Sequence, residues 1–274
     1  MSCELWSHDS RSQTQDGYHV THGALMTQDS QLTTARGRRH YNPPGPSRIR
    51  ECWLSEVLPG TRTLTRNRQA QLEFDLPTSP RDRKIWCAGN IELLRRARSV
   101  AIVGTRVVSA EGAARARRLA HELAEQRIVV VSGLAKGVDT EALTAAIEAG
   151  GSVIAVIGTP LDQAYPIENA PLQELIARHH LIVSQFQPGA STFPGHFPER
   201  NRLMAAVTDA TAIIEAGNAS GTLHQAAECV RLGRWLFIAR SVIDDPSIEW
   251  PAKLRGRARV RTLTETSDIL DVLS

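Results

Sequence analysis

The chain has 274 residues, of which 42% are hydrophobic and 22% charged, and its formal net charge at pH 7 is +3. This composition is ordinary for a soluble globular protein of one or two domains, and so weak a positive charge does not by itself predict a nucleic-acid partner. The four cysteines are scattered without a C-x-x-C pair, which argues against a disulfide scaffold or a metal site. No apolar run approaches the roughly 18 residues of a membrane span, and no secretory signal is evident, so we expect a cytoplasmic protein without a membrane partner.

Residues 1–47 are rich in Ser, Thr, Gln, His and Arg and show no apolar period. They end in Asn42-Pro43-Pro44-Gly45-Pro46-Ser47, which favours neither a helix nor a central strand. We therefore predict a disordered N-terminal tail, and a functional role for it stays open. Residues 48–98 contain short apolar pieces such as Trp53-Leu54 and Ile85-Trp86, and we expect a short N-terminal extension packed on the core.

From residue 99 onward, short apolar strands alternate with amphipathic helices. The predicted strands are 100–103, 128–131, 153–157, 181–183, 212–214 and 235–238. The predicted helices run over about 109–126, 139–149, 169–178, 200–207 and 220–232, with Ser109 and Asp139 as caps. This alternation predicts an α/β fold with a doubly wound, mostly parallel sheet and helices on both faces. Such sheets bind ligands at the carboxyl ends of their strands.

Four of these strands end in a turn that contains glycine together with hydroxyl or basic side chains. The turns are Gly104-Thr105-Arg106, Ser132-Gly133-Leu134-Ala135-Lys136-Gly137, Gly158-Thr159-Pro160, and the segment from Glu215 to Thr222 that includes Ser220 and Gly221. Such turns expose backbone N–H groups at the positive end of a helix dipole, and Arg106 and Lys136 add charge. Together they predict a phosphate site, although each turn alone is explained as well by the structural need for glycine and a cap.

Two common phosphate-binding motifs are missing. A P-loop requires G-x-x-x-x-G-K-[ST], but Gly137-Val138-Asp139 follows Lys136 where a hydroxyl should stand. The dinucleotide fingerprint G-x-G-x-x-G is absent after the first strand, which continues as Gly104-Thr105-Arg106-Val107. We therefore expect neither ATP hydrolysis nor nicotinamide chemistry.

The segment Phe197-Pro198-Glu199-Arg200-Asn201-Arg202 places an aromatic ring and two arginines at the start of a helix. Arginine binds phosphate oxygens in a forked geometry, and an aromatic ring can stack on a base. The alternative is that Arg200 and Arg202 pair with Glu215 or Asp209 and only hold the helix in place. The residues alone do not decide between the two.

Taken in order, these segments resemble the motifs of the DprA/Smf family of DNA-processing proteins of natural transformation. The resemblance is carried by residues 101–106, 132–139, 158–169, 197–206 and 215–222, and it extends from about residue 85 to 239. It implies that residues 99–240 form an extended Rossmann-like domain that binds single-stranded DNA, protects incoming strands and helps to load the RecA recombinase. It also implies a homodimer, with no cofactor and no catalytic residue.

The resemblance further implies which residues contact phosphates or bases. Carried over by position, they are Gly104, Thr105, Arg106, Ser132, Gly133, Lys136, Phe197, Arg200, Asn201 and Arg202. The strand-end turns add Ser220, Gly221 and Thr222 as phosphate-binding candidates. Departures from the family pattern at Leu143, Gln185, His224 and Gln225 concern details of the pocket.

The same fold also suggests an enzyme, because phosphoribohydrolases use a similar glycine-rich turn with a carboxylate three residues after its threonine. Here Gln225 stands three residues after Thr222 and cannot ionise, so that reading lacks its key acid. Glu228 lies one helical turn further on, where we expect a solvated or paired side chain. A nucleotide sensor that uses the same loops is the other alternative to a DNA-binding protein.

Residues 241–274 contain a second basic run and a final apolar pattern. The run Lys253-Leu254-Arg255-Gly256-Arg257-Ala258-Arg259-Val260-Arg261 predicts either a wider DNA track or an exposed strand edge protected by charge. Residues 263–273 predict a closing amphipathic helix.

Overall fold

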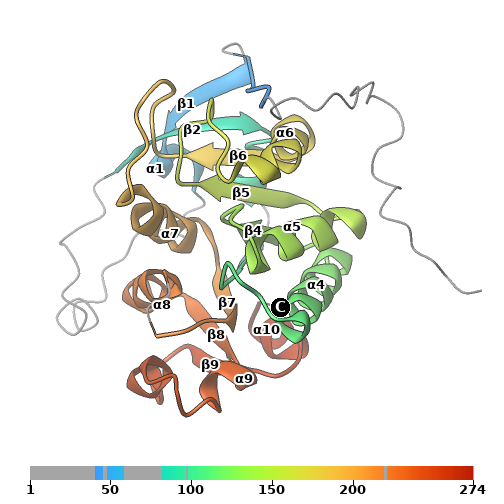
Figure 1. Ribbon diagram of the computed structural model, residues 1–274, viewed down its shortest axis with the longest axis vertical. Coiled ribbons are helices and arrows are strands. Elements are labelled where there is room, and N and C mark those ends of the chain that lie inside the picture. Colours follow the sequence, from blue (N-terminus) through green and yellow to red (C-terminus); the bar gives the residue numbers. More distant parts are fainter. Residues whose placement is uncertain (1–40, 46–47, 59–81, 97, 219–220, 274) are drawn as a thin grey trace, which may run out of the picture. The chain divides into compact units, whose positions relative to one another are not determined.

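The computed structural model describes residues 41–45, 48–58, 82–96, 98–218 and 221–273 (Figure 1). These residues form one nine-stranded sheet in the order β1-β2-β6-β5-β4-β3-β7-β8-β9. Its strands are β1 (Ile49–Trp53), β2 (Lys84–Gly89), β3 (Ser99–Gly104), β4 (Val129–Ser132), β5 (Val153–Ile157), β6 (Leu181–Ser184), β7 (Ala210–Glu215), β8 (Trp235–Ala239) and β9 (Val260–Leu263). All neighbours from β6 to β9 are parallel, whereas β2 is antiparallel to β6 and to β1. The predicted mostly parallel sheet is confirmed.

Helices cover both faces of the sheet, because successive strand residues point into two separate cores. Val100 and Ile102 of β3 belong to the core beneath α4 (Ala110–Glu125), α5 (Val138–Glu148), α6 (Ala170–His179) and α10 (Ser267–Leu273). Ala101 and Val103 belong to the core beneath α1 (Leu54–Val57), α3 (Glu92–Arg96), α7 (His196–Val207), α8 (Thr222–Arg231) and α9 (Arg240–Ile243). Short 3-10 helices span Ile167–Asn169 and Trp250–Leu254. The doubly wound arrangement is thus confirmed.

The predicted N-terminal extension and C-terminal segment both contribute strands to this sheet. β1 and β2 extend it at one edge, and β9 forms the other edge. Charged residues interrupt β1, and its Glu51 Oε1 lies 2.6 Å from Nζ of Lys84, the first residue of β2. The rest of β2 is the short apolar run of residues 85–88. Of the basic run, Val260 and Arg261 lie in β9, and the closing helix is present as α10.

The two predicted helix caps have different outcomes. Ser109 caps α4 as expected, since its Oγ accepts the Gly112 N–H at 3.0 Å. The prediction for Asp139 is wrong: the cap of α5 is Gly137, and Asp139 lies in the first helical turn with its side chain buried. Gly137 has a φ of 79°, a conformation that favours glycine. Because Gly137 is the cap, the helix begins earlier than it would if Asp139 were the cap.

Part of the predicted tail belongs to the folded unit. Tyr41 Oη donates to the Leu161 carbonyl at 2.7 Å and accepts from Gln173 Nε2 at 2.7 Å, and burial raises the pKa of Tyr41 to about 12. The Asn42 N–H donates to Glu174 Oε1 at 2.7 Å. The remaining tail prediction, for residues 1–40 and 46–47, lies outside the described residues. Within the part that the structure describes, no helix combines the length and the apolar character needed to cross a membrane.

Candidate nucleic-acid interface

A cavity of about 210 Å³ lies at the carboxyl ends of β3, β4 and β5, and we call it the β3–β5 cavity. It is lined by Arg106, Gly133, Ala135, Lys136, Gly158, Tyr165, Pro166, Phe197 and Arg200. The fold thus brings together five predicted site residues from three separate segments, and it places them where doubly wound sheets bind ligands. The cavity lies beside the point where the strand order reverses, between β3 and β7.

The ring of Phe197 forms one wall of this cavity. Its centroid lies 5.3 Å from that of Tyr165, and the guanidinium carbon of Arg106 lies 5.5 Å from it. Gly158 lets the ring approach the backbone, because a Cβ at this position would lie 2.7 Å from Phe197 Cδ1. Tyr165 is 52% exposed, and Arg106 is exposed as well. The result is an aromatic and cationic surface open to solvent, which is the kind of surface on which an unpaired base stacks.

Lys136 stands on the same open side of the cavity. Its Nζ lies 2.8 Å from Glu168 Oε1, and both side chains are more than half exposed. An exposed pair of this kind contributes little to stability, so a phosphate can compete with Glu168 for the lysine. We call Arg106, Lys136, Tyr165 and Phe197 the outer layer of the site.

Beneath the outer layer, Ser132, Asp139 and Arg200 form what we call the inner layer. Asp139 and Arg200 are each only 5% exposed, and Ser132 is fully buried. Asp139 Oδ2 accepts the N–H groups of Gly133 at 3.1 Å and Ala135 at 3.3 Å. The internal carboxylate therefore already occupies backbone donors that we expected a phosphate to use.

Arg200 is bound to the protein itself. Its Nη1 donates to the carbonyl groups of Gly133 and Val156, the latter at 3.0 Å, and its Nε donates to Asn201 Oδ1 at 2.8 Å. Burial lowers the pKa of Arg200 and raises that of Asp139, and the charge of each opposes the shift of the other. Arg200 thus pairs with neither Glu215 nor Asp209, the two partners that we considered. It forms the floor of the cavity and is not an exposed side chain that could bind a phosphate with both of its terminal nitrogens.

At the start of α4, where we also expected an anion site, the donor groups of Ser109 are already bound by the Glu215 carboxylate. Glu215 Oε1 accepts the Ser109 N–H at 3.1 Å, and Oε2 accepts its hydroxyl at 2.6 Å. The Thr105 N–H donates to the Glu215 carbonyl at 2.7 Å. Gly104 and Thr105 therefore hold β3 against β7, and neither lines the β3–β5 cavity.

The remaining predicted residues lie outside the cavity. Asn201 Nδ2 donates to the Gly221 carbonyl at 2.8 Å and so ties α7 to the turn before α8. Thr222 is buried, and Ser220 lies outside the described residues. Arg202 is half-buried, and its Nε has no hydrogen-bond partner among the described residues. Ser132 Oγ donates to the Ile102 carbonyl at 2.7 Å and links β4 to β3.

Four lining residues of the cavity were missing from our prediction, Ala135, Gly158, Tyr165 and Pro166, and the two that shape the ring of Phe197 are Tyr165 and Gly158. Both follow β5, and Gly158 stood in a turn that we had identified without assigning it to the site. An exposed tyrosine in such a turn was the available signal for Tyr165. Its contact with Phe197 joins residues 32 positions apart in the sequence and could not be read from spacing.

Gln225 and Glu228, which we considered when weighing a hydrolase, do not line the cavity. Gln225 is fully buried, and its Nε2 donates to Thr211 Oγ1 at 3.1 Å. Glu228 is buried and paired with Arg231, with Oε1 2.5 Å from Nη2, so it is paired as expected but not solvated. None of the described residues that line the cavity is a carboxylate, and no cluster of metal-ligating side chains occurs in the described ranges.

The fold and the site define a class of protein: a Rossmann-like α/β domain with an aromatic and cationic cavity at its strand ends. The family model for DNA recombination-mediator protein A matches residues 71–274. The chain belongs to this family, which confirms the resemblance to DprA/Smf proteins.

Individual relatives agree with this assignment. The chain is 42% identical over 161 residues to the DNA processing protein DprA of Streptococcus pneumoniae, covering 58% of this chain and 56% of that protein. Among solved structures, DprA from S. pneumoniae matches with a TM-score of 0.67 and 32% identity over 81% of this chain and 74% of that one. DNA processing protein A from Helicobacter pylori, described with a single-stranded DNA binding mode, matches with a TM-score of 0.66 and 26% identity over 82% and 95% of the two chains. This chain thus spans little more than half the length of the curated S. pneumoniae protein.

Proposed function

We propose that this protein binds single-stranded DNA through the outer layer of the β3–β5 cavity, as a member of the recombination-mediator family. The observation that carries the proposal is that the ring of Phe197 lies next to both Tyr165 and Arg106, in a cavity whose lining, over the described residues, includes no carboxylate. A base that is paired and stacked in a duplex cannot reach such a ring, whereas an unpaired base can. Arg106 and Lys136 then neutralise the neighbouring phosphates.

We also propose the finer parts of the function, and family membership supports them. The protein protects incoming single strands, helps to load a RecA-type recombinase and acts as a homodimer. We propose no catalytic step. Gln225 stands where a hydrolase would have its acid, Glu228 is the next carboxylate along the helix, and both are buried and do not line the cavity. The related protein from H. pylori, described with a single-stranded DNA binding mode, supports the choice of ligand.

The test is a titration of labelled oligo-dT of increasing length at several salt concentrations. We expect affinity to rise with length and to fall steeply with salt, with a log–log slope of about −0.7 for each phosphate contacted. Arg106→Ala should weaken binding roughly tenfold and flatten the slope by about 0.7, because a charged contact is lost. Arg178→Ala, which removes an exposed arginine of α6 outside the cavity, is the matched control and should bind like the wild type.

A second candidate is a nucleotide sensor that uses the same aromatic and cationic side chains. A volume of about 210 Å³ accommodates a single base but little more. A sensor would bind a free mononucleotide tightly and gain nothing from a longer oligonucleotide. The length series therefore separates the two functions, and a flat series would reject the DNA-binding proposal.

A further inference from the structure

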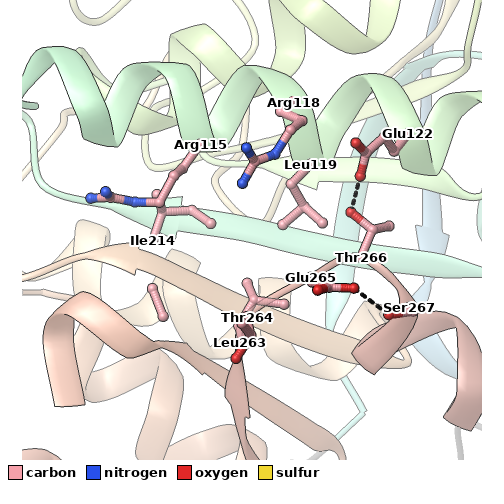
Figure 2. Close-up of a pocket in the computed structure, with 11 residues that line it drawn as sticks. Arg115, Arg118, Leu119, Glu122, Ile214, Leu263, Thr264, Glu265, Thr266 and Ser267 are labelled. Atoms are coloured by element: carbon pink, nitrogen blue, oxygen red, sulfur yellow. Dashed lines mark hydrogen bonds between the residues drawn. The ribbon is translucent and has the colours of Figure 1, made fainter. Parts of the chain in front are cut away.

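A second cavity, of about 590 Å³, lies at the other side of the strand reversal, and we call it the α4–β9 cavity (Figure 2). Its floor is formed by Ile214, Ala239 and Leu263, which lie at the carboxyl ends of β7, β8 and β9. Helix α4 forms one wall, and the loop from β9 to α10 forms the other. The two cavities share no lining residue.

One end of the α4–β9 cavity is cationic. Arg115 and Arg118 are three residues apart on α4, so their side chains lie on the same face of the helix. Arg118 is exposed and has no ion pair or hydrogen bond with any described residue. Arg115 lies 3.8 Å from Glu215 Oε2, and its Nε is buried without a hydrogen-bond partner in the described part of the chain. The Arg118 guanidinium is thus available to an anion, and Arg115, whose guanidinium points toward the other side, adds positive charge at the same end (Figure 2).

The other end of the cavity offers acceptors. Figure 2 shows Glu122 turned toward Thr266, and Glu265 toward Ser267, on the side away from the arginines. Each carboxylate accepts a hydrogen bond from a hydroxyl group there, and its remaining lone pairs can accept further hydrogen bonds from a ligand. Between the two ends lie the apolar side chains of Leu119, Ile214 and Leu263. A ligand that fits this arrangement has an anionic group, a flat or apolar body and hydrogen-bond donors at its far end.

We propose that the α4–β9 cavity binds a nucleoside phosphate. The phosphate binds Arg118 at the end to which Arg115 adds positive charge, the base covers the apolar floor, and amino or hydroxyl groups donate to Glu122 and Glu265. The volume falls within the range of about 300–1,000 Å³ that small-molecule sites occupy, whereas the β3–β5 cavity is below it. The position also suits this class of ligand, because open α/β sheets bind nucleotides at the carboxyl ends of their strands.

Calorimetric titration of the full-length protein with AMP, ADP and dTMP tests the proposal, beside inorganic phosphate and adenosine alone. We expect at least one nucleoside phosphate to bind more tightly than either of its halves. Arg118→Glu should weaken that binding by about tenfold or more, since an attractive charge becomes a repulsive one. Arg255→Glu makes the same change at an exposed arginine that lines neither cavity, and it should leave the binding unchanged.

Two results would overturn the proposal. One is the absence of any binding by the wild type at millimolar nucleoside phosphate. The other is binding that Arg118→Glu leaves intact and Phe197→Ala removes, because the ligand would then occupy the β3–β5 cavity. Arg118 is exposed and unpaired among the described residues, so the variant is expected to fold, and Arg115→Ala provides a second variant at the same end.

Discussion

The inner and outer layers of the β3–β5 cavity each contain an arginine, but the two layers differ in their exposure to solvent and in their hydrogen-bond partners. In the inner layer, Asp139 and Arg200 are almost fully buried, and both are hydrogen-bonded to backbone groups of the protein. In the outer layer, Arg106 and Tyr165 are exposed beside the half-buried ring of Phe197. The same motif segments, residues 132–139 and 197–202, therefore contribute both to the buried support of the site and to its exposed surface. The two layers should respond differently to substitution.

The largest effect is expected in the inner layer, on stability. Asp139→Ala would leave the N–H groups of Gly133 and Ala135 without their acceptor and Arg200 without a neighbouring negative charge. We expect the free energy of unfolding to fall by about 3 kcal/mol, as measured by urea denaturation. Glu168→Ala removes an exposed carboxylate beside the same cavity and should change it by less than about 1 kcal/mol. Equal losses in the two variants would contradict the division into layers.

The next effect is expected in the outer layer, on binding. Phe197→Ala removes the ring proposed to stack on a base, so the binding free energy for oligo-dT should weaken by about 1–3 kcal/mol. The salt slope should stay unchanged, because no charge is lost. Trp53→Ala removes an exposed aromatic side chain from β1 and serves as the control. A loss of the same size in both variants would mean that Phe197 has no particular role.

A smaller effect should follow from moving the ring without removing it. Gly158→Ala places a Cβ 2.7 Å from Phe197 Cδ1, so the ring must shift away from its present position. We expect affinity for oligo-dT to fall roughly threefold, which corresponds to about 0.6 kcal/mol. The matched control is Gly195→Ala, where a Cβ meets nothing within 4 Å. If both variants bind like the wild type, the position of the ring is not important for binding.

The smallest effect is expected at the pair between Lys136 and Glu168. Glu168→Gln removes the carboxylate that competes with DNA phosphates for Lys136, so affinity for oligo-dT should rise by about twofold at low salt. Lys136→Ala should instead lower affinity and flatten the salt slope by about 0.7. Weaker binding by Glu168→Gln would argue that Glu168 orients the lysine for binding.

Much of the fold could be predicted from the sequence, because the central strands are continuous apolar runs. β1 was missed as a strand because it lies at the edge of the sheet and the charged residues Arg50 and Glu51 interrupt its apolar pattern. β2 was missed although residues 85–88 are apolar, because so short a run does not by itself distinguish a strand from a buried helical segment. Tyr41 was assigned to the tail because its partners, Leu161 and Gln173, lie more than 100 residues away in the sequence.

The site could be predicted only as a set of segments. The turns after β3 and β4 and the start of α7 do meet, as expected from the parallel sheet. The sequence could not show that Asp139 and Glu215 would occupy the backbone donors of these turns, because hydrogen bonding to an internal carboxylate depends on tertiary distance. For the same reason, Arg106 and Arg200 looked equivalent, although one is exposed and the other forms the floor of the cavity.

The central claim is that DNA bases contact the outer layer, and photocrosslinking tests it most directly. The wild-type protein would be irradiated with single strands that carry 5-iodo-deoxyuridine, and the crosslinked peptides would be identified by mass spectrometry. We expect the adducts on Tyr165 and Phe197, and we expect Phe197→Ala to remove those at position 197 alone. Adducts confined to other surfaces, such as Trp235 of β8 with its neighbours Arg259 and Arg261, would contradict the account.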